Sequence, residues 1–314
     1  MDALLGIDIG GTSIKAGLFT MDGDLSDVRT IPTGAIVDEG AYSEICAGLD
    51  ALLTDNGFAP DDVMALGLDV PGPVDAAGHV GVLANIKLDP DGLRLALKTH
   101  YKRASLAFVN DANAAALGEL WKGAARGHGS SVMVTLGTGV GGGIIVNDRL
   151  VAGAFGAGGE IGHMTMDPDE TRACGCGGYG HLEQYCSATG LVTLYKEECE
   201  SRGVQGAEVN YASDSLTVFQ ALAAGDECAK SALDKMLAKL AMAFAQIAVI
   251  VDPEIFIIGG GMAGSFDVFA DDLKAIYDEL AFGPCKNAQI VAAELGNKAG
   301  MYGCAYEALR GTKA

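Results

Sequence analysis

Two glycine-rich turns, each set between two β-like runs, contain the residue types that phosphate binding requires. They are residues 6–15 (GIDIGGTSIK) and residues 136–143 (LGTGVGGG). Glycines let backbone N–H groups approach a phosphate with no Cβ in the way. In the first turn Thr12 can add a hydroxyl, Lys15 a positive charge and Asp8 a water-mediated contact to Mg²⁺. One such turn is equally compatible with an ordinary hairpin, but two in corresponding halves favour a site that holds one triphosphate from both sides.

A third glycine cluster, residues 259–264 (GGGMAG), matches the dinucleotide pattern G-x-G-x-x-G, and so do residues 137–142. The earlier match runs into a β-like segment, whereas the dinucleotide fingerprint opens a helix. The later match does follow a strand and precede a helix, but no nucleotide-binding half surrounds it. We therefore interpret it as the adenosine side of an ATP site. A nicotinamide-dependent oxidoreductase remains an alternative that a comparison of ATP with NAD in a thermal-shift assay would test.

The pair Asn110-Asp111 stands where a strand is expected to end and a helix to begin. A carboxylate there can accept the proton of a sugar hydroxyl during phosphoryl transfer, and Asn110 can hydrogen-bond a neighbouring hydroxyl. The alternative is a helix cap, which Asn and Asp commonly provide. Glu160, His163 and Glu183 follow in glycine-rich segments and could surround a polyol with hydrogen bonds; each would otherwise be an ordinary loop residue.

Four potential metal ligands occur in one short span. His163, Cys174, Cys176 and His181 form the pattern H-x10-C-x-C-x4-H. Soft and borderline ligands in this number suit tetrahedral Zn²⁺, and a segment with no hydrophobic run of its own would gain its order from the metal. All four positions are filled, so the site is predicted to be structural. The alternative is a glycine-rich loop whose cysteines are incidental.

The elements that must position these residues follow a repeated order. Three β-like runs, a helix over 42–55, a strand (MALGLDV), a helix (GLRLALKTHYK) and a strand (SLAFVND) make up the first part. Three further β-like runs (SVMVTLG, GGGIIVN and RLVAGA) begin the second part. They precede helices near 187–202, 215–224 and 229–251, the strand EIFIIG, a helix over 265–280 and the strand NAQIVAAEL.

A duplicated βββαβα module of this kind predicts an α/β fold of the actin-like or ribonuclease-H-like class, with two domains around a cleft. The patterned helix near 301–309 is expected to return to the first domain. The predicted domains are residues 1–112 plus 300–314 and residues 113–299, the latter with the zinc loop.

Composition and charge narrow the classes of function that the chain could have. The chain has 314 residues and a formal net charge of -20. A strongly acidic protein lacks the cationic face that nucleic acids require, so a nucleic-acid partner is not expected. No stretch reads as a signal peptide or a membrane span, and scattered cysteines fit a reducing compartment, so a cytoplasmic protein is expected.

Taken in order, the motifs resemble those of the ROK family of sugar kinases and sugar-responsive repressors, above all its bacterial glucokinase branch. The resemblance covers nearly the whole chain. It rests on GIDIGGTSIKAG, DVPGPVD, VNDANAAALGE, LGTGVGGG, GAGGEIGHMTM, CGCGGYGHLEQYCSATGL and EIFIIGGG.

The resemblance implies an ATP- and Mg²⁺-dependent kinase that acts on a hexose, with glucose expected first and fructose, mannose or N-acetylated hexosamines such as N-acetylmannosamine as alternatives. It implies Asp111 as the general base and a homodimer or higher homo-oligomer. The implied sugar contacts are Gly72, Asn85, Asn110, Asp111, Glu160, His163 and Glu183. The implied nucleotide contacts are Asp8, Gly10, Gly11, Thr12, Lys15, Gly137, Thr138, Gly139, Gly141, Gly259, Gly260 and Gly261.

Two positions depart from the family pattern. His181 stands where the family's zinc motif usually has a third cysteine, and zinc accepts either ligand. The segment after Asn85 reads IKLDPDGL, without the Gly-Trp pair common in glucokinases, which bears on sugar preference. A repressor of the same family would carry a helix-turn-helix before the first phosphate strand, and this chain begins that strand at about its third residue.

Overall fold

Apolar β-like runs at the start of the chain form a five-stranded sheet in the computed structural model, which describes residues 2–11, 13–32, 34–83 and 86–312. The strands are β1 (Ala3–Ile9), β2 (Ser13–Phe19), β3 (Leu25–Pro32), β4 (Val63–Val70) and β5 (Ser105–Asn110), in the order β3-β2-β1-β4-β5. β1 pairs with β2 antiparallel and with β4 parallel, and β4 pairs with β5 parallel. The carboxyl ends of β1, β4 and β5 therefore lie at one edge of the sheet.

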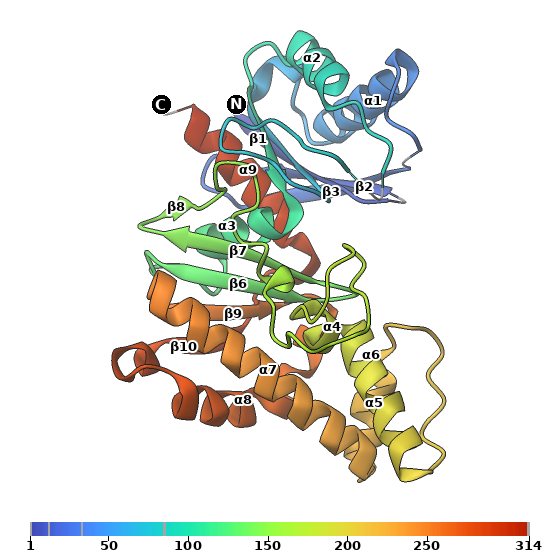
Figure 1. Cartoon of the computed structure of the whole chain (residues 1–314). Helices are drawn as coiled ribbons and strands as arrows, with labels where there is room; N and C mark the ends of the chain where they lie inside the picture. The colour runs from blue at the N-terminus through green and yellow to red at the C-terminus, as the bar shows by residue number, and fades with distance from the viewer. Residues whose placement is uncertain (1, 12, 33, 84–85, 313–314) are drawn as a thin grey trace. The chain divides into compact units, whose positions relative to one another are not determined.

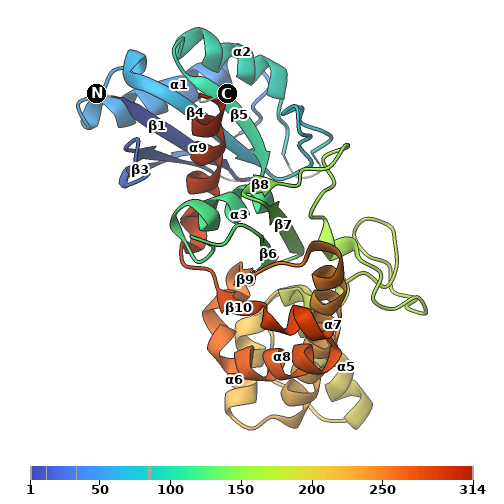
Figure 2. The ribbon, with the colours of Figure 1, turned by 90° about the vertical axis from the view of Figure 1, so that its left-hand side faces the viewer.

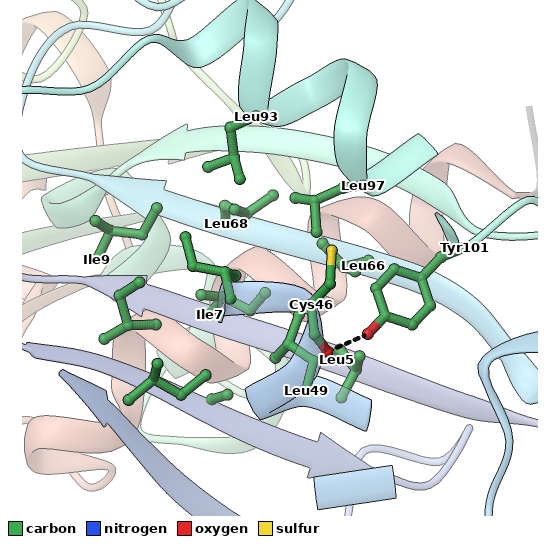
Figure 3. Close-up of a cluster of buried hydrophobic side chains, with 14 of the residues drawn as sticks. Leu5, Ile7, Ile9, Cys46, Leu49, Leu66, Leu68, Leu93, Leu97 and Tyr101 are labelled. Carbon is green, nitrogen blue, oxygen red and sulfur yellow. Dashed lines mark hydrogen bonds between the residues drawn. The ribbon is translucent and has the colours of Figure 1, made fainter. Parts of the chain in front are cut away.

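Helices cover both faces of this sheet because its strands are apolar on both sides. One face carries α1 (Glu39–Asp55) and α2 (Pro90–His100) (Figure 1). Leu49 of α1 and Leu97 of α2 are buried there with strand residues such as Leu66. The hydroxyl of Tyr101 donates to the Cys46 carbonyl at 3.4 Å at the edge of this cluster (Figure 3).

The other face is covered by α9 (Ala299–Gly311), which lies along β1 and β4 (Figure 2). Glycines permit its close approach. A Cβ on Gly6 of β1 would overlap the carbonyl oxygen of Met301, and one on Gly67 of β4 would overlap that of Cys304. Backbone-to-backbone packing of this kind explains why two glycines are tolerated inside buried strands.

The second half forms a sheet with strand order β10-β9-β6-β7-β8. When β6 is counted as the first strand and the sheet is read from β8 to β10, this is the strand order of the first sheet, so the predicted duplication is confirmed. Its strands are β6 (Ser131–Leu136), β7 (Val140–Val146), β8 (Arg149–Leu150), β9 (Ile255–Gly259) and β10 (Gln289–Ala292). β8 and β10 are shorter than the runs RLVAGA and NAQIVAAEL suggested, because only part of each run is paired.

Helices of the second half are α4 (Glu183–Cys186), α5 (Ala188–Arg202), α6 (Ser215–Ala223), α7 (Glu227–Val251) and α8 (Phe266–Leu280). Aromatic packing joins two of them to the sheet: Phe244 of α7 stacks on Phe256 of β9 at 4.4 Å, and Phe256 meets Tyr277 of α8 edge-on. Within the part of the chain that the structure describes, no helix is long and apolar enough to cross a membrane.

The chain divides into two compact units. Unit 1 comprises Met1–Gly127, Gly143–Gly158 and Glu294–Ala314, and unit 2 comprises His128–Gly142 and Gly159–Ala293. The expected boundary at residues 112 and 113 falls instead inside α3 (Asp111–Lys122), which lies wholly in unit 1. The reason is the close packing of α3 on α9: a Cβ on Gly118 would overlap the carbonyl oxygen of Ala299, and one on Gly303 that of Ala114.

Candidate functional site

Three aspartates lie at the carboxyl edge of the unit 1 sheet. Asp8 is near the end of β1, and its register partner on β4 is Asp69. Asp69 pairs in turn with Val109 of β5, two residues before Asp111. Parallel strands bring their carboxyl ends to one edge, which is where α/β proteins commonly bind ligands. The structure thus brings the first phosphate-binding candidate and the candidate base to the same edge.

Asp69 belongs to this group but was not predicted from the sequence. It is 1% exposed, and its Oδ2 atom has no hydrogen-bond partner among the described residues. Burial, followed by the charges of Asp8 and Asp111, raises the pKa of Asp69 well above its usual range. Burial also raises the pKa of Asp8, partly offset by the positive charge of Lys15 and by a hydrogen bond with Asp69. The sequence feature that could have identified Asp69 is an acidic residue inside the otherwise apolar strand β4.

Of the two roles that the sequence left open for Asn110 and Asp111, the structure assigns the helix cap to Asn110. Asn110 is the cap of α3: its side-chain oxygen accepts from the Asn113 N–H at 3.0 Å, while its amide donates to the Gly72 carbonyl at 3.1 Å. Asp111 is the first residue of the helix and is exposed, with Oδ1 accepting from the Ala112 N–H at 2.8 Å. An exposed carboxylate on a fixed helix terminus can meet a ligand, because the neighbouring asparagine already caps the helix.

The first glycine turn is a tight connection between β1 and β2. The Gly10 N–H donates to the Ser13 carbonyl at 3.0 Å, and Gly11 is exposed. Lys15 on β2 lies directly across from Asp8 in the strand register. Thr12 and Asn85, two of the predicted contacts, lie outside the described residues.

The two glycine clusters of unit 2 lie at the ends of neighbouring strands. Residues 137–139 follow β6, where the Gly137 N–H donates to the Gly139 carbonyl at 3.0 Å. The other cluster follows β9, which pairs with β6 in parallel. Gly260 has a φ of 78° and packs so tightly on Leu136 that a Cβ would lie 2.6 Å from its carbonyl oxygen. The predicted phosphate turn and the predicted adenosine turn are therefore adjacent.

The four predicted metal ligands come together. One ligand atom from each of His163, Cys174, Cys176 and His181 lies within 4.8 Å of all the others. The Cys176 Sγ and His181 Nδ1 atoms are 3.3 Å apart. A tight turn fixes the positions of the two cysteines, because the Cys174 N–H donates to the Gly178 carbonyl at 2.8 Å. Two sulfurs and two imidazoles at this spacing fit tetrahedral zinc. Burial raises the pKa of Cys174, so a bound metal would have to displace its proton.

Glu160 and Glu183, two further predicted sugar contacts, lie beside this cluster, and a third, His163, belongs to it. Glu160 and His163 are exposed, with 3.8 Å between the Glu160 Oε2 and His163 Nε2 atoms. Glu183, by contrast, is partly engaged: its Oε2 accepts from the Val140 N–H at 3.0 Å. A cavity of about 170 Å³ beside it is lined by Thr138 of the glycine loop and by Cys174 of the metal cluster.

Comparison with known proteins identifies relatives along the whole chain. A sequence model described as "ROK family" matches residues 4–310. A glucokinase of Halalkalibacterium halodurans is 34% identical over 95% of this chain and 92% of its own length. An N-acetyl-D-glucosamine kinase of Vibrio vulnificus is 30% identical over 98% of this chain and 99% of its own. The crystal structure of a ROK family glucokinase from Streptomyces griseus, in complex with glucose and AMPPNP, is 32% identical. It superposes with a TM-score of 0.75 over 96% of this chain and 98% of its own.

Proposed function

The chain belongs to the ROK family, and from this premise we propose that it is an ATP-dependent sugar kinase with glucose as its preferred acceptor. The observation that carries the proposal is the position of Asp111. Its carboxylate is exposed at the first turn of α3, at the strand edge shared with Asp8 and Asp69. A base must be reachable by the hydroxyl it deprotonates and held by a rigid element, and this residue meets both conditions.

In the proposed reaction Asp111 accepts the proton of a hexose hydroxyl as the hydroxyl oxygen attacks the γ-phosphorus of ATP. The bond from the γ-phosphorus to the bridging oxygen breaks, and ADP leaves. Asn110 hydrogen-bonds a neighbouring hydroxyl while its amide remains tied to Gly72.

Each unit carries its own proposed binding residues. Unit 1 supplies Asn110, Asp111 and the first glycine turn, and unit 2 supplies the glycine turns after β6 and β9. We assign the turn after β6 to the phosphates and the turn after β9 to the nucleoside. Glu160, His163 and Glu183 are the proposed sugar contacts of unit 2.

Two metals fit the residues present. Zinc would be held by His163, Cys174, Cys176 and His181, where it would order the loop that carries three of them. Mg²⁺ would reach Asp8 through water and would neutralise charge on the nucleotide phosphates. The chain itself supplies the carboxylate of Asp8, which lies across from Lys15 on β2 and from Asp69 on β4 in the strand register.

The relatives support glucose and also one alternative. Glucokinases reach 34% identity, and N-acetyl-D-glucosamine kinases reach 30% with equally complete coverage. An N-acetylated hexosamine is therefore the second candidate acceptor. The two differ at the substituent on C2, so a single panel of sugars separates them.

The experiment is a coupled ADP-release assay with ATP and a panel of hexoses, on the purified chain and on Asp111→Ala. Loss of the base should lower kcat by about 10²–10⁴-fold and leave sugar binding, measured by calorimetry, nearly unchanged. The matched control is Asp91→Ala, another exposed aspartate in the first turn of a unit 1 helix. Turnover of Asp111→Ala close to that of the control would contradict the assignment.

A further inference from the structure

The glycine loop after β6 is attached to the segment that follows the metal cluster. The Val140 N–H donates to Glu183 Oε2 at 3.0 Å, and the Ala188 N–H donates to the Gly137 carbonyl at 2.8 Å. The Thr189 hydroxyl donates to the Thr138 carbonyl at 3.0 Å. Three hydrogen bonds thus join residues 137–140 to residues 183–189.

The carboxylate of Glu183 reaches this loop because Gly139 has no side chain. A Cβ built on Gly139 would overlap Glu183 Oε2. The glycine is therefore explained by the approach of the carboxylate and not by a left-handed φ. Glu183 was predicted from the sequence only as a sugar contact, and its bond to the loop is a feature of the tertiary structure.

The same segment is attached to the metal cluster at its other end. Glu183 begins α4 two residues after the ligand His181, and its Oε1 lies 3.7 Å from Sγ of the ligand Cys174. The Leu182 N–H donates to the Met164 carbonyl at 2.9 Å, next to the ligand His163. Fixing the ligands therefore fixes the residue from which the Glu183 side chain extends.

We infer that Glu183 is a positioning residue that couples occupancy of the His163–Cys174–Cys176–His181 cluster to the conformation of the glycine loop at residues 137–140. The cluster would then support nucleotide binding as well as sugar binding. The inference rests on the proposed function in one respect, that this loop holds nucleotide phosphates. A loop rich in glycine has few side chains to pack, so its conformation depends strongly on the hydrogen bonds that its backbone makes.

Nucleotide affinity without sugar is the first readout. Calorimetry with a non-hydrolysable ATP analogue should show about tenfold weaker binding after the metal is stripped by a chelator, the effect of losing roughly one well-made hydrogen bond. Glu183→Ala should weaken binding similarly in metal-loaded protein, and Glu183→Gln should recover part of the loss. Thr189→Val removes a loop bond made by a residue that is not a ligand, and it should weaken binding with metal content unchanged.

Tyr185→Phe is the matched control. It removes a 2.8 Å hydrogen bond that runs from the same short helix to Glu170 and not to the glycine loop. Its nucleotide affinity should equal that of the unmodified protein. Metal content of every variant, measured by atomic emission, separates loss of the coupling from loss of the ion.

Amide hydrogen exchange is the second readout and does not depend on ATP. The Val140 N–H should exchange faster in Glu183→Ala and in metal-stripped protein than in the loaded protein. If the loaded protein binds no nucleotide, the proposed function fails, and exchange at Val140 still decides the coupling. Unchanged exchange at Val140 on stripping the metal, together with unchanged affinity in Glu183→Ala, would overturn the inference.

Discussion

Glu119 is a fully buried carboxylate whose removal should be costly. It lies near the end of α3, the helix that begins with Asp111, and it is 0% exposed. Its Oε2 accepts from the Ala124 N–H at 2.7 Å and from the Glu294 N–H at 3.1 Å, and its Oε1 accepts from the Leu295 N–H at 2.8 Å. The side chain thus joins the end of α3 to the segment that leads into α9.

The loss of stability on removing the Glu119 carboxylate follows from the three N–H groups that would lose their acceptor. An unpaired, buried donor costs about 1–3 kcal/mol, and these donors are only partly buried, so we take about 1 kcal/mol for each. Glu119→Ala should then lower the free energy of unfolding by about 3 kcal/mol. Glu119→Gln keeps one acceptor but turns an amide N–H toward a donor, and we expect a loss of about 2 kcal/mol.

Urea denaturation can follow this change through Trp121, the single tryptophan of the chain, which lies two residues from Glu119 and packs against Tyr302 and Tyr306. Glu44→Ala, an exposed glutamate on α1, is the control and should change the stability by less than about 0.5 kcal/mol. The reasoning is refuted if Glu119→Ala unfolds within about 1 kcal/mol of the unmodified chain, a smaller loss than even one well-paired bond explains.

Three further outcomes are expected. Because the pKa of Asp69 is raised, its contribution to stability is full below about pH 4 and is lost as pH rises toward the folded-state pKa, at about 1.4 kcal/mol per unit. Asp69→Asn should flatten that slope in pH-dependent denaturation; an unchanged slope would show that Asp69 does not titrate this way. Gly303→Ala should cost about 1–3 kcal/mol, since its Cβ would overlap the Ala114 carbonyl, whereas Gly283→Ala, with open space around it, should be neutral in the same melts. Cys176→Ser should lower zinc content and Tm together, and a normal zinc content would contradict its role as a ligand.

The amino-acid sequence by itself determined the features that depend on local pattern. Periodicity and turn residues predicted the order of strands and helices, and the strand order of both sheets confirms the duplication. The spacing of His163, Cys174, Cys176 and His181 predicted a cluster that the structure assembles. These predictions succeed because neighbouring residues set backbone conformation, and because a short loop can bring its own ligands together. The catalytic and binding roles of individual residues remain predictions.

Only the tertiary structure decided the features that join distant parts of the chain. Asp69 faces Asp8 through a parallel register, Glu119 accepts from backbone groups about 175 positions away, and Glu183 bonds to the loop at Val140. The assignment of α3 to unit 1 likewise depends on glycines that let it pack on α9. No local pattern encodes such pairs, because the sequence around a buried acid or a glycine does not show which distant residue it contacts. Their partners are set by strand register and by how closely two backbones can pack.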